Sequence, residues 1–189
     1  MRKLVYYVAA SLDGRIADAD GDPSAFPNDP ATLAALFDRY PETCPAHVRG
    51  ALGITAEPAR FDAVILGRRT HQPAIDAGLE HGAYPHLEQY VVSRSELPAG
   101  SRLHRLSGDL SAEVRELKAR PGRDIWLCGG AEIARQLVTE IDEIQVKLNP
   151  VLLGRGVPLL PFDGAARPLR LDRVEPLTGD VLLLTYSPA

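Results

Sequence analysis

One segment in the last third of the chain combines a buried strand, a glycine turn and the start of a helix. Residues 125–128 are Ile-Trp-Leu-Cys, Gly129-Gly130 follow, and an amphipathic run then spans residues 131–139. The apolar residues suit a strand that is covered on both faces, and the glycines remove two Cβ atoms where the chain turns. Free N–H groups at the start of the helix point back at this turn and favour an anion there. The segment predicts either a tight turn without a ligand or a seat for a phosphate.

Segments of strand type alternate with segments of helix type through the first three quarters of the chain. This pattern predicts the α/β class, with a mostly parallel central sheet and helices on both faces. The last two strands are joined by a short turn at Thr178-Gly179 and should form an antiparallel hairpin. Residues 1–189 are expected to form a single domain. The expected strands span residues 4–10, 63–66, 89–92, 125–128, 143–148, 169–176 and 180–186; the expected helices span residues 30–40, 110–119 and 131–139, with a short one after Thr70.

Charge and composition argue against several classes of function. The net charge of −4 disfavours a general nucleic-acid binder. The two cysteines, Cys44 and Cys128, lie far apart, and no His, Cys or Glu spacing is typical of a metal site. The histidines are expected to be solvated loop residues. The apolar run at residues 4–10 is too short for a signal peptide or a membrane span. We therefore expect a cytoplasmic protein with a small-molecule substrate and without metal, nucleic-acid or membrane partners.

Polar and glycine-rich stretches follow four of the expected strands. They begin after the first strand, after Leu66, after Val92 and after Cys128. In open α/β sheets, ligands bind at the carboxyl ends of the strands. The convergence of four such ends predicts a binding site at this edge of the sheet.

Five motifs along nearly the whole chain carry a family resemblance. They are Ser11-Leu12-Asp13-Gly14-Arg15-Ile16-Ala17, Leu66-Gly67-Arg68-Arg69-Thr70, Val91-Val92-Ser93-Arg94, Cys128-Gly129-Gly130-Ala131-Glu132-Ile133 and Asn149-Pro150-Val151-Leu152-Leu153-Gly154-Arg155-Gly156. In this order they resemble the dihydrofolate reductase superfamily. The resemblance is closer to the branch that contains the reductase domain of riboflavin biosynthesis (RibD C-terminal-like), and within it to stand-alone members. It implies a dihydrofolate-reductase-like three-layer α/β/α fold and hydride transfer from NADPH.

The resemblance implies how two of the motifs would hold NADPH. Gly67, Arg68, Arg69 and Thr70 would hold the pyrophosphate at a helix start through backbone amides, a hydroxyl and fork-shaped arginine donors. A solvated arginine pair is the alternative. Ser93-Arg94 would bind the 2′-phosphate of the cofactor, as an arginine does in other NADP sites, which favours NADPH over NADH. A plain polar strand end is the alternative there.

The nicotinamide side of the cofactor is implied to lie on the glycine turn and the first strand. The family places a non-proline cis peptide bond between Gly129 and Gly130, and we predict one here. Ala9, Ala10 and Ile16 are expected to flank the nicotinamide ring, with simple burial as the alternative. The residues of the turn motif that are assigned to the cofactor are Cys128, Gly129, Gly130, Ala131, Glu132 and Ile133.

Two carboxylates are the candidates for the catalytic residues. Asp13 lies beside the expected nicotinamide, and the alternative is a turn aspartate that binds its own backbone. Asp29 lies just before the helix at residues 30–40. In folate reductases an acidic residue on the equivalent helix grips the pterin ring, and the resemblance implies this role for Asp29. The alternative for Asp29 is a helix N-cap. Phe37 lies at core spacing on that helix and is interpreted as a core residue.

The resemblance favours an NADPH-dependent reductase of a small heterocyclic (pterin- or pyrimidine-like) or carbonyl substrate. An alternative is the reductase of 5-amino-6-(5-phosphoribosylamino)uracil in riboflavin biosynthesis, which would need a phosphate clamp such as Arg15, Arg155 or Arg173. A second alternative is a sensor that binds NADPH without turnover. The resemblance also implies a homodimer, which we expect to form through the apolar strand at residues 181–185, since an exposed apolar edge invites pairing.

Overall fold

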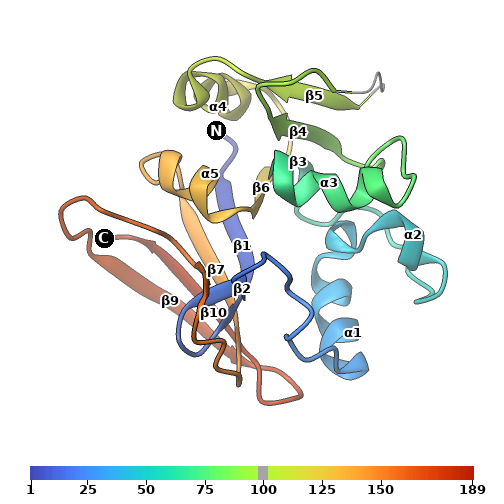
Figure 1. Cartoon of the computed structure of the whole chain (residues 1–189), viewed down its shortest axis with the longest axis vertical. Helices are drawn as coiled ribbons and strands as arrows, with labels where there is room; N and C mark the ends of the chain where they lie inside the picture. The colour runs from blue at the N-terminus through green and yellow to red at the C-terminus, as the bar shows by residue number, and fades with distance from the viewer. Residues whose placement is uncertain (98–101) are drawn as a thin grey trace.

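A central sheet of eight strands organises the chain in the computed structural model, which describes residues 1–97 and 102–189 (Figure 1). Its strands in chain order are β1 (Leu4–Ser11), β3 (Phe61–Gly67), β4 (Glu88–Val92), β5 (Leu103–Leu106), β6 (Asp124–Gly129), β7 (Glu143–Asn149), β9 (Leu169–Pro176) and β10 (Leu182–Pro188). Their order across the sheet is β5-β4-β3-β6-β1-β7-β10-β9. The first strand of the chain therefore lies inside the sheet, between two strands from its second half.

The sheet is parallel except at its C-terminal hairpin. β1 pairs in parallel with β6 and β7, β3 with β4 and β6, and β4 with β5. β10 runs antiparallel to both β7 and β9. This arrangement confirms the expected fold, a mostly parallel α/β sheet that ends in an antiparallel hairpin.

Helices cover the two faces of the sheet and complete three layers. They are α1 (Pro30–Arg39), α2 (Ala46–Arg49), α3 (Arg68–Asp76), α4 (Leu110–Ala119) and α5 (Ala131–Gln136), with a 3₁₀ turn, η1, at Pro41–Thr43. One core cluster joins Val114 of α4 and Leu137 after α5 to Tyr6 of β1. The second cluster joins Leu36 of α1 to Tyr7 and Trp126 on the opposite face. Figure 1 shows α4 and α5 on one side of the sheet and α1, α2 and α3 on the other.

Local sequence explains the helices that were predicted well. Asp29 caps α1 by accepting a hydrogen bond from the Thr32 N–H, and Pro30 occupies the first turn, where no amide hydrogen is needed. Asp109 caps α4 in the same way through the Ala112 N–H. The helix expected at residues 131–139 is shorter in the structure. α5 ends at Gln136, where the N–H of the capping residue Leu137 donates to the carbonyl oxygens of Ile133 and Arg135.

Three short strands were not expected from the sequence. β5 has buried leucines only at Leu103 and Leu106, so it lacks the alternation that marks a strand. β2 (Arg15–Asp18) and β8 (Gly156–Pro158) form a separate antiparallel pair. Because these partners lie about 140 residues apart in the chain, no local pattern announces their pairing.

The C-terminal hairpin corrects the expectation about residues 181–185. We expected this strand to present an exposed edge, but β10 lies between β7 and β9 and is paired on both sides. β9 is the outer strand instead, with Leu169, Leu171 and Val174 exposed. The homodimer itself stays a prediction. Within the residues described, no helix is long and apolar enough to cross a membrane.

The burial of β10 generates a stability prediction. Leu183 of β10 is 0% exposed, whereas Leu171 of the neighbouring β9 is 50% exposed. We expect Leu183→Ala to lower the free energy of unfolding by about 3 kcal/mol, because a buried cavity is left behind. Leu171→Ala, the matched control, should change it by less than about 0.5 kcal/mol. Urea unfolding of both variants checks this, and equal effects of the two would contradict the buried position of β10.

Candidate functional site

The carboxyl ends of neighbouring parallel strands bring the predicted cofactor motifs together. Leu66 at the end of β3 pairs with Gly129 of β6, and Gly67 pairs with Val92 of β4. A Cβ atom on Gly67 would lie 3.2 Å from Ile133 Cγ1 and 3.5 Å from the Gly130 nitrogen. The first distance is tighter than nine in ten real Cβ contacts and the second is an ordinary van der Waals contact, so the β3–α3 and β6–α5 turns pack closely at Gly67, which has no side chain.

The glycine turn has the predicted backbone. The peptide bond between Gly129 and Gly130 is cis, which confirms the expectation, and Gly129 has a φ of 139°. A φ of this sign is accessible to glycine and strained for other residues. The Thr70 side chain reaches over from α3: its Oγ1 would lie 3.7 Å from a Cβ atom on Gly130. The turn therefore exposes bare backbone next to the start of α3.

The start of α3 offers hydrogen-bond donors that the protein does not use. Gly67 is the N-cap and provides no side-chain acceptor for the first amides. Among the described residues, Arg68 Nη1 is buried and has no hydrogen-bond partner, while Arg68 Nε donates to Gln72 at 3.0 Å. Arg69 and Thr70 are exposed. A helix start with spare amides and an unsatisfied guanidinium is the arrangement that binds phosphate groups.

The two residues at the end of β4 that were assigned to the 2′-phosphate differ in their surroundings. The Ser93 hydroxyl is buried and engaged in its own turn, since it donates to Ser95 O at 2.9 Å and accepts from Ser95 N at 3.1 Å. Arg94 is exposed. An anion at this strand end would therefore meet the Arg94 guanidinium rather than the Ser93 hydroxyl.

The remaining residues of the turn motif serve packing or helix stability. Ala131 and Ile133 are buried. The exposed Glu132 carboxylate accepts from Arg135 at 2.7 Å, and hydrogen bonds from Arg135 and Gln136 lower its pKa to about 2. Cys128 is half-buried, and desolvation raises the pKa of its thiol to about 12, so it stays protonated.

The end of β1 contributes small residues next to β7. Ala10 is buried, and Ala9 and Ile16 are half-buried. Ala9 pairs with Lys147 of β7, and Ile16 packs against the core cluster that contains Tyr6. Their contact with a nicotinamide ring stays a prediction.

Asp13 joins the turn after β1 to the loop after β7 by hydrogen bonds. Its Oδ1 accepts from the Ser11 hydroxyl at 2.6 Å and from Leu153 N at 3.0 Å, and its Oδ2 accepts from Gly154 N at 2.7 Å. These hydrogen bonds, that from Ser11 first, lower the pKa of Asp13 to about 2. The carboxylate is therefore ionised at neutral pH and holds no proton to donate; its catalytic role stays a prediction.

Asp29 is likewise engaged by its neighbours. Its Oδ2 accepts from both N and Oγ1 of Thr32 at 2.7 Å, and from Thr178 Oγ1 at 3.2 Å. The hydrogen bonds from Thr32 are the main cause of its lowered pKa. Asp29 thus caps α1 and joins it to the turn between β9 and β10, while its role toward a substrate also stays a prediction.

Lys147 is a candidate site residue that the sequence reasoning missed. Its ammonium nitrogen lies 4.2 Å from the centroid of the Tyr7 ring. Desolvation lowers the pKa of Lys147 to about 8, against a smaller opposing effect of Cys128. Polar and apolar residues alternate along β7, and Lys147 lies on its polar face with Gln145 and Asn149, so the sequence did not single it out. A lysine at such a position usually extends its charge into water, so its orientation needed the structure.

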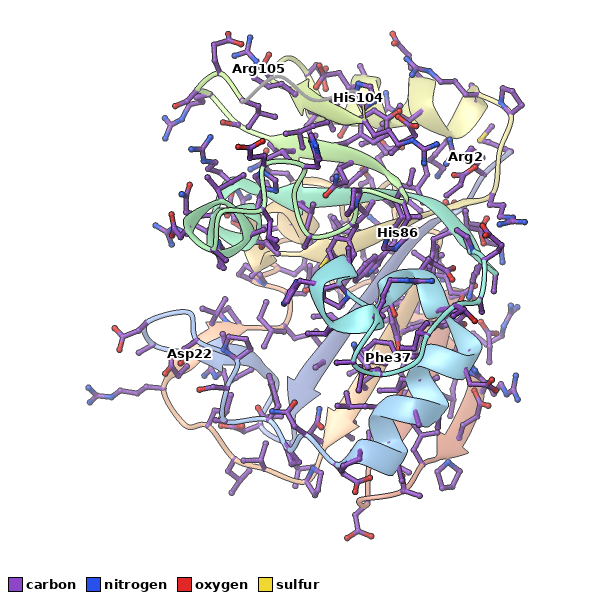
Figure 2. All side chains as sticks on the ribbon, turned by 90° about the vertical axis from the view of Figure 1, so that its right-hand side faces the viewer. Arg2, Asp22, Phe37, His86, His104 and Arg105 are labelled. Atoms are coloured by element: carbon purple, nitrogen blue, oxygen red, sulfur yellow. The ribbon has the colours of Figure 1, made fainter. Side chains whose placement is uncertain are left out.

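The histidines supply no metal site. His86 Nε2 lies 2.8 Å from Glu42 O, and His104 Nε2 lies 2.7 Å from Glu88 Oε2; Figure 2 shows His104 on β5 and His86 on the segment before β4. His71 is 1% exposed, contrary to the expectation of a solvated residue, and both its ring nitrogens lack hydrogen-bond partners in the described residues. Burial lowers the pKa of His71. No group of three potential metal ligands occurs within residues 1–97 and 102–189.

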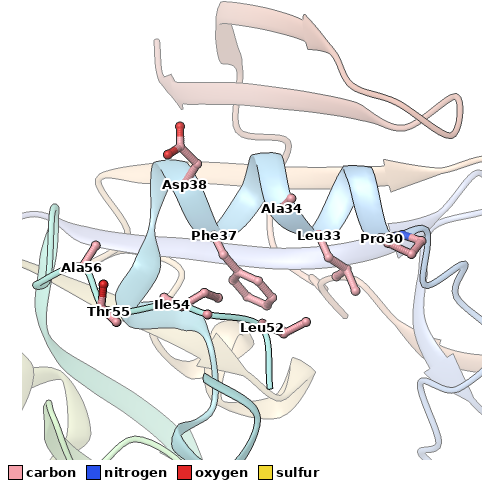
Figure 3. Close-up of a pocket in the computed structure, with 10 residues that line it drawn as sticks. Pro30, Leu33, Ala34, Phe37, Asp38, Leu52, Ile54, Thr55 and Ala56 are labelled. Carbon is pink, nitrogen blue, oxygen red and sulfur yellow. The ribbon is translucent and has the colours of Figure 1, made fainter. Parts of the chain in front are cut away.

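An apolar pocket of about 380 Å³ lies between α1 and residues 52–56. Figure 3 shows Leu33 and Phe37 projecting from α1 toward Leu52 and Ile54. Phe37 was interpreted as a core residue; it is half-buried and lines this pocket instead.

Comparison with protein families assigns the chain. Residues 2–183 match the RibD C-terminal domain family. The chain belongs to this family. Two Bacillus subtilis (strain 168) proteins, both called uncharacterized, are similar to this RibD C-terminal domain. YwjB is 29% identical over 163 residues, or 84% of this chain and 82% of YwjB. YyaP is 35% identical over 74 residues, which cover 38% of this chain and only 39% of YyaP.

Solved structures share the fold of this RibD C-terminal domain. A protein of Shewanella sp. PV-4, described as a riboflavin biosynthesis protein, has a TM-score of 0.69 at 24% identity and covers 100% of this chain and 99% of its own. A Thermotoga maritima deaminase/5-amino-6-(5-phosphoribosylamino)uracil reductase has a TM-score of 0.65 at 18% identity, with 100% of this chain and 57% of that chain covered. A dihydrofolate reductase of Enterococcus faecalis, complexed with NADP(H), has a TM-score of 0.61 at 13% identity, with 98% and 96% covered.

The hydrogen bonds of Asp13 predict a pH dependence of stability. The pKa of Asp13 is lowered in the folded state, so the carboxylate stabilises the fold above its unfolded pKa near 4. This contribution is lost as the pH falls through about 2. We expect Asp13→Asn to be less stable than the parent protein at pH 6, with a difference that shrinks toward pH 2.

Urea unfolding at pH 6, 4 and 2 measures this difference. Asp38→Asn is the matched control, because Asp38 is exposed and accepts no hydrogen bond from the described residues. A pH-independent effect of Asp13→Asn would contradict the role of its charge.

Proposed function

We propose that the protein is an NADPH-dependent reductase that transfers a hydride to a small heterocyclic or carbonyl substrate. One observation carries the proposal: the Gly129–Gly130 turn and the start of α3 touch each other, and Arg68 of α3 has a guanidinium nitrogen without a hydrogen-bond partner in the described residues. Membership of the RibD C-terminal domain family supports it. So does the shared fold of reductases, one of which is complexed with NADP(H).

The residues at the strand ends fit such a cofactor. The α3 amides, Arg68 and Thr70 would hold the pyrophosphate, and the bare backbone of Gly129-Gly130 would lie under it. The exposed Arg94 would meet the 2′-phosphate. When bound, the reduced nicotinamide supplies the hydride, while the protein contributes orientation and electrostatics.

Two alternatives compete with this proposal: a reductase of the riboflavin pathway intermediate and a sensor without turnover. For reduction of 5-amino-6-(5-phosphoribosylamino)uracil, a phosphate clamp is needed; of its candidates, Arg173 pairs with Glu175 at 2.8 Å and Arg15 donates to Gly156 O at 3.4 Å. These two arginines are partly engaged, whereas the third candidate, Arg155, is exposed. A sensor without turnover would need no proton donor, so the ammonium of Lys147 beside β1 favours the enzyme.

Cofactor choice is the first prediction of this proposal. We expect NADPH to bind at least about tenfold more tightly than NADH, because Arg94 gains a charge-assisted contact with the 2′-phosphate. Arg94→Gln should narrow that ratio and leave NADH binding unchanged. Calorimetry at one fixed ionic strength measures both, since salt screens exposed charges.

Arg170→Gln is the control for this measurement, because Arg170 lies on β9, at the opposite edge of the sheet from β4 and β5. Its NADPH affinity should equal that of the parent protein. If neither cofactor binds, the reductase proposal fails. If NADPH binds, loss of its absorbance with a panel of heterocyclic and carbonyl compounds identifies the substrate class.

A further inference from the structure

The lysines of this chain differ in how their charge is balanced. The chain contains three, Lys3, Lys118 and Lys147. Lys3 pairs with Glu143 at 3.4 Å, and Lys118 pairs with Asp142 at 2.6 Å. Within residues 1–97 and 102–189, the Lys147 ammonium has neither an ion pair nor a hydrogen bond, and the Tyr7 ring is its partner. Its three N–H donors therefore remain available to a ligand.

Lys147 lies on β7, next to the carboxyl-terminal half of β1. It pairs with Ala9 of β1 on one side and with Leu183 of β10 on the other. The buried Leu183 belongs to the core cluster that contains Tyr7 and Trp126, on the face that α1 covers. Lys147 is half-buried, so it retains a path to solvent while protein surrounds most of it. Its ammonium lies over the Tyr7 ring, and its surroundings include Cys128, which directly precedes the Gly129–Gly130 turn.

In the part of the chain that the structure describes, no carboxylate forms an ion pair with Lys147, and Cys128 is the titratable neighbour that affects its pKa. Cys128 of β6 acts on it weakly and keeps its own proton, because burial raises the thiol pKa to about 12. Tyr7 of β1 has its pKa raised by burial, and its hydroxyl is buried without a partner in the described residues. Arg39 of α1 is paired with Glu175 of β9. Lys147 is therefore a cation near neutral pH whose proton is released more readily than that of an ordinary lysine.

The carboxylates of the site cannot supply a proton in its place. Asp13 and Asp29 accept hydrogen bonds that lower the pKa of each, so both are ionised at neutral pH. Cys128 and Tyr7 hold their protons much more tightly than Lys147 does. An acid whose pKa lies near the working pH is the most effective proton donor.

We propose that Lys147 is the proton donor of the reduction and that the substrate presents a carbonyl oxygen to its ammonium group. This inference rests on the proposed reductase function. The carbonyl carbon takes up a hydride, with its electron pair, from the reduced nicotinamide cofactor. The π electrons of the C=O bond move to the oxygen, which takes a proton from Lys147 Nζ. The products are an alcohol, the oxidised cofactor and a neutral lysine, which regains its proton from water.

Reductive alkylation with acetone and sodium cyanoborohydride tests whether a carbonyl compound reaches Lys147. The full-length protein is labelled without cofactor between pH 6 and pH 10, and mass spectrometry of peptides separates the three lysines. We expect Lys147 to react with a midpoint near pH 8, at a lower pH than the ion-paired Lys3. A Lys147 that stays unlabelled, or reacts only together with Lys3, overturns the inference. Because no cofactor is used, this result is independent of the proposed function.

Variants then test the proton transfer itself. Lys147→Met should leave the calorimetric Kd for NADPH within about twofold and lower kcat for a carbonyl substrate by about 100-fold or more. Lys147→Arg, which keeps the charge but does not release a proton, should lose the fall in rate that the parent protein shows as the pH rises through about 8. Lys3→Met is the control and should retain both activity and pH profile.

The outcomes separate the two proposals. If the parent protein does not bind NADPH, the proposed reductase function is wrong, but the labelling result for Lys147 is unaffected. Intact NADPH binding, with full turnover or an unchanged pH profile in the Lys147 variants, would defeat the role of Lys147 alone.

Discussion

The contact between the β3–α3 and β6–α5 turns is the constraint on which the site depends. Glycine at position 67 favours this contact, because a Cβ atom there would lie 3.2 Å from Ile133 Cγ1, which is tighter than most real contacts. Because β3 and β6 are parallel and Leu66 pairs with Gly129, the two turns lie side by side at the same edge of the sheet. As a result, the start of α3 and the Thr70 side chain lie next to the bare backbone of the glycine turn. Larger side chains there would push the turns apart.

Charge is distributed over this site in an unusual way. The aspartates nearest to the strand ends hold loops and helix starts in place, Asp13 through Leu153 and Gly154, and Asp29 through Thr32 and Thr178. Their hydrogen bonds stabilise the charged form, and this leaves them poor acids. Lys147 is the opposite case, since its charge is held by an aromatic face and opposed by burial. The structural role of the aspartates and the proposed chemical role of Lys147 therefore belong to different residues.

The sequence was sufficient for most of the fold, because strong local signals mark its main elements. Asp29 and Pro30 announce α1, and the apolar run before Gly129 announces β6. It was not sufficient for β2 and β8, whose pairing depends on residues about 140 positions apart. The same limit applied to residues 181–185. Their apolar character resembled that of an edge, whereas it reflects burial between β7 and β9.

For the site, sequence motifs located the backbone features but could not reveal how polar side chains are used. The cis bond at Gly129–Gly130 followed from the motif. The Ser93 hydroxyl was assigned to a ligand, but it bonds to Ser95, a choice that depends on the local turn. Lys147 was passed over, because alternation along β7 shows which face it occupies but not that its partner is an aromatic ring. Contacts between strands distant in sequence decide such questions.

The central position of β1 has a consequence for how this chain acquires its structure. β1, residues 4–11, precedes the other strands of the sheet in this chain and pairs with β6 and β7, which begin at residues 124 and 143. Until those residues emerge, an apolar strand has no hydrogen-bonding neighbour on either side. The core on both faces of the sheet therefore closes late in synthesis. Fragments that end before β6 would leave β1 as an unpaired, aggregation-prone strand.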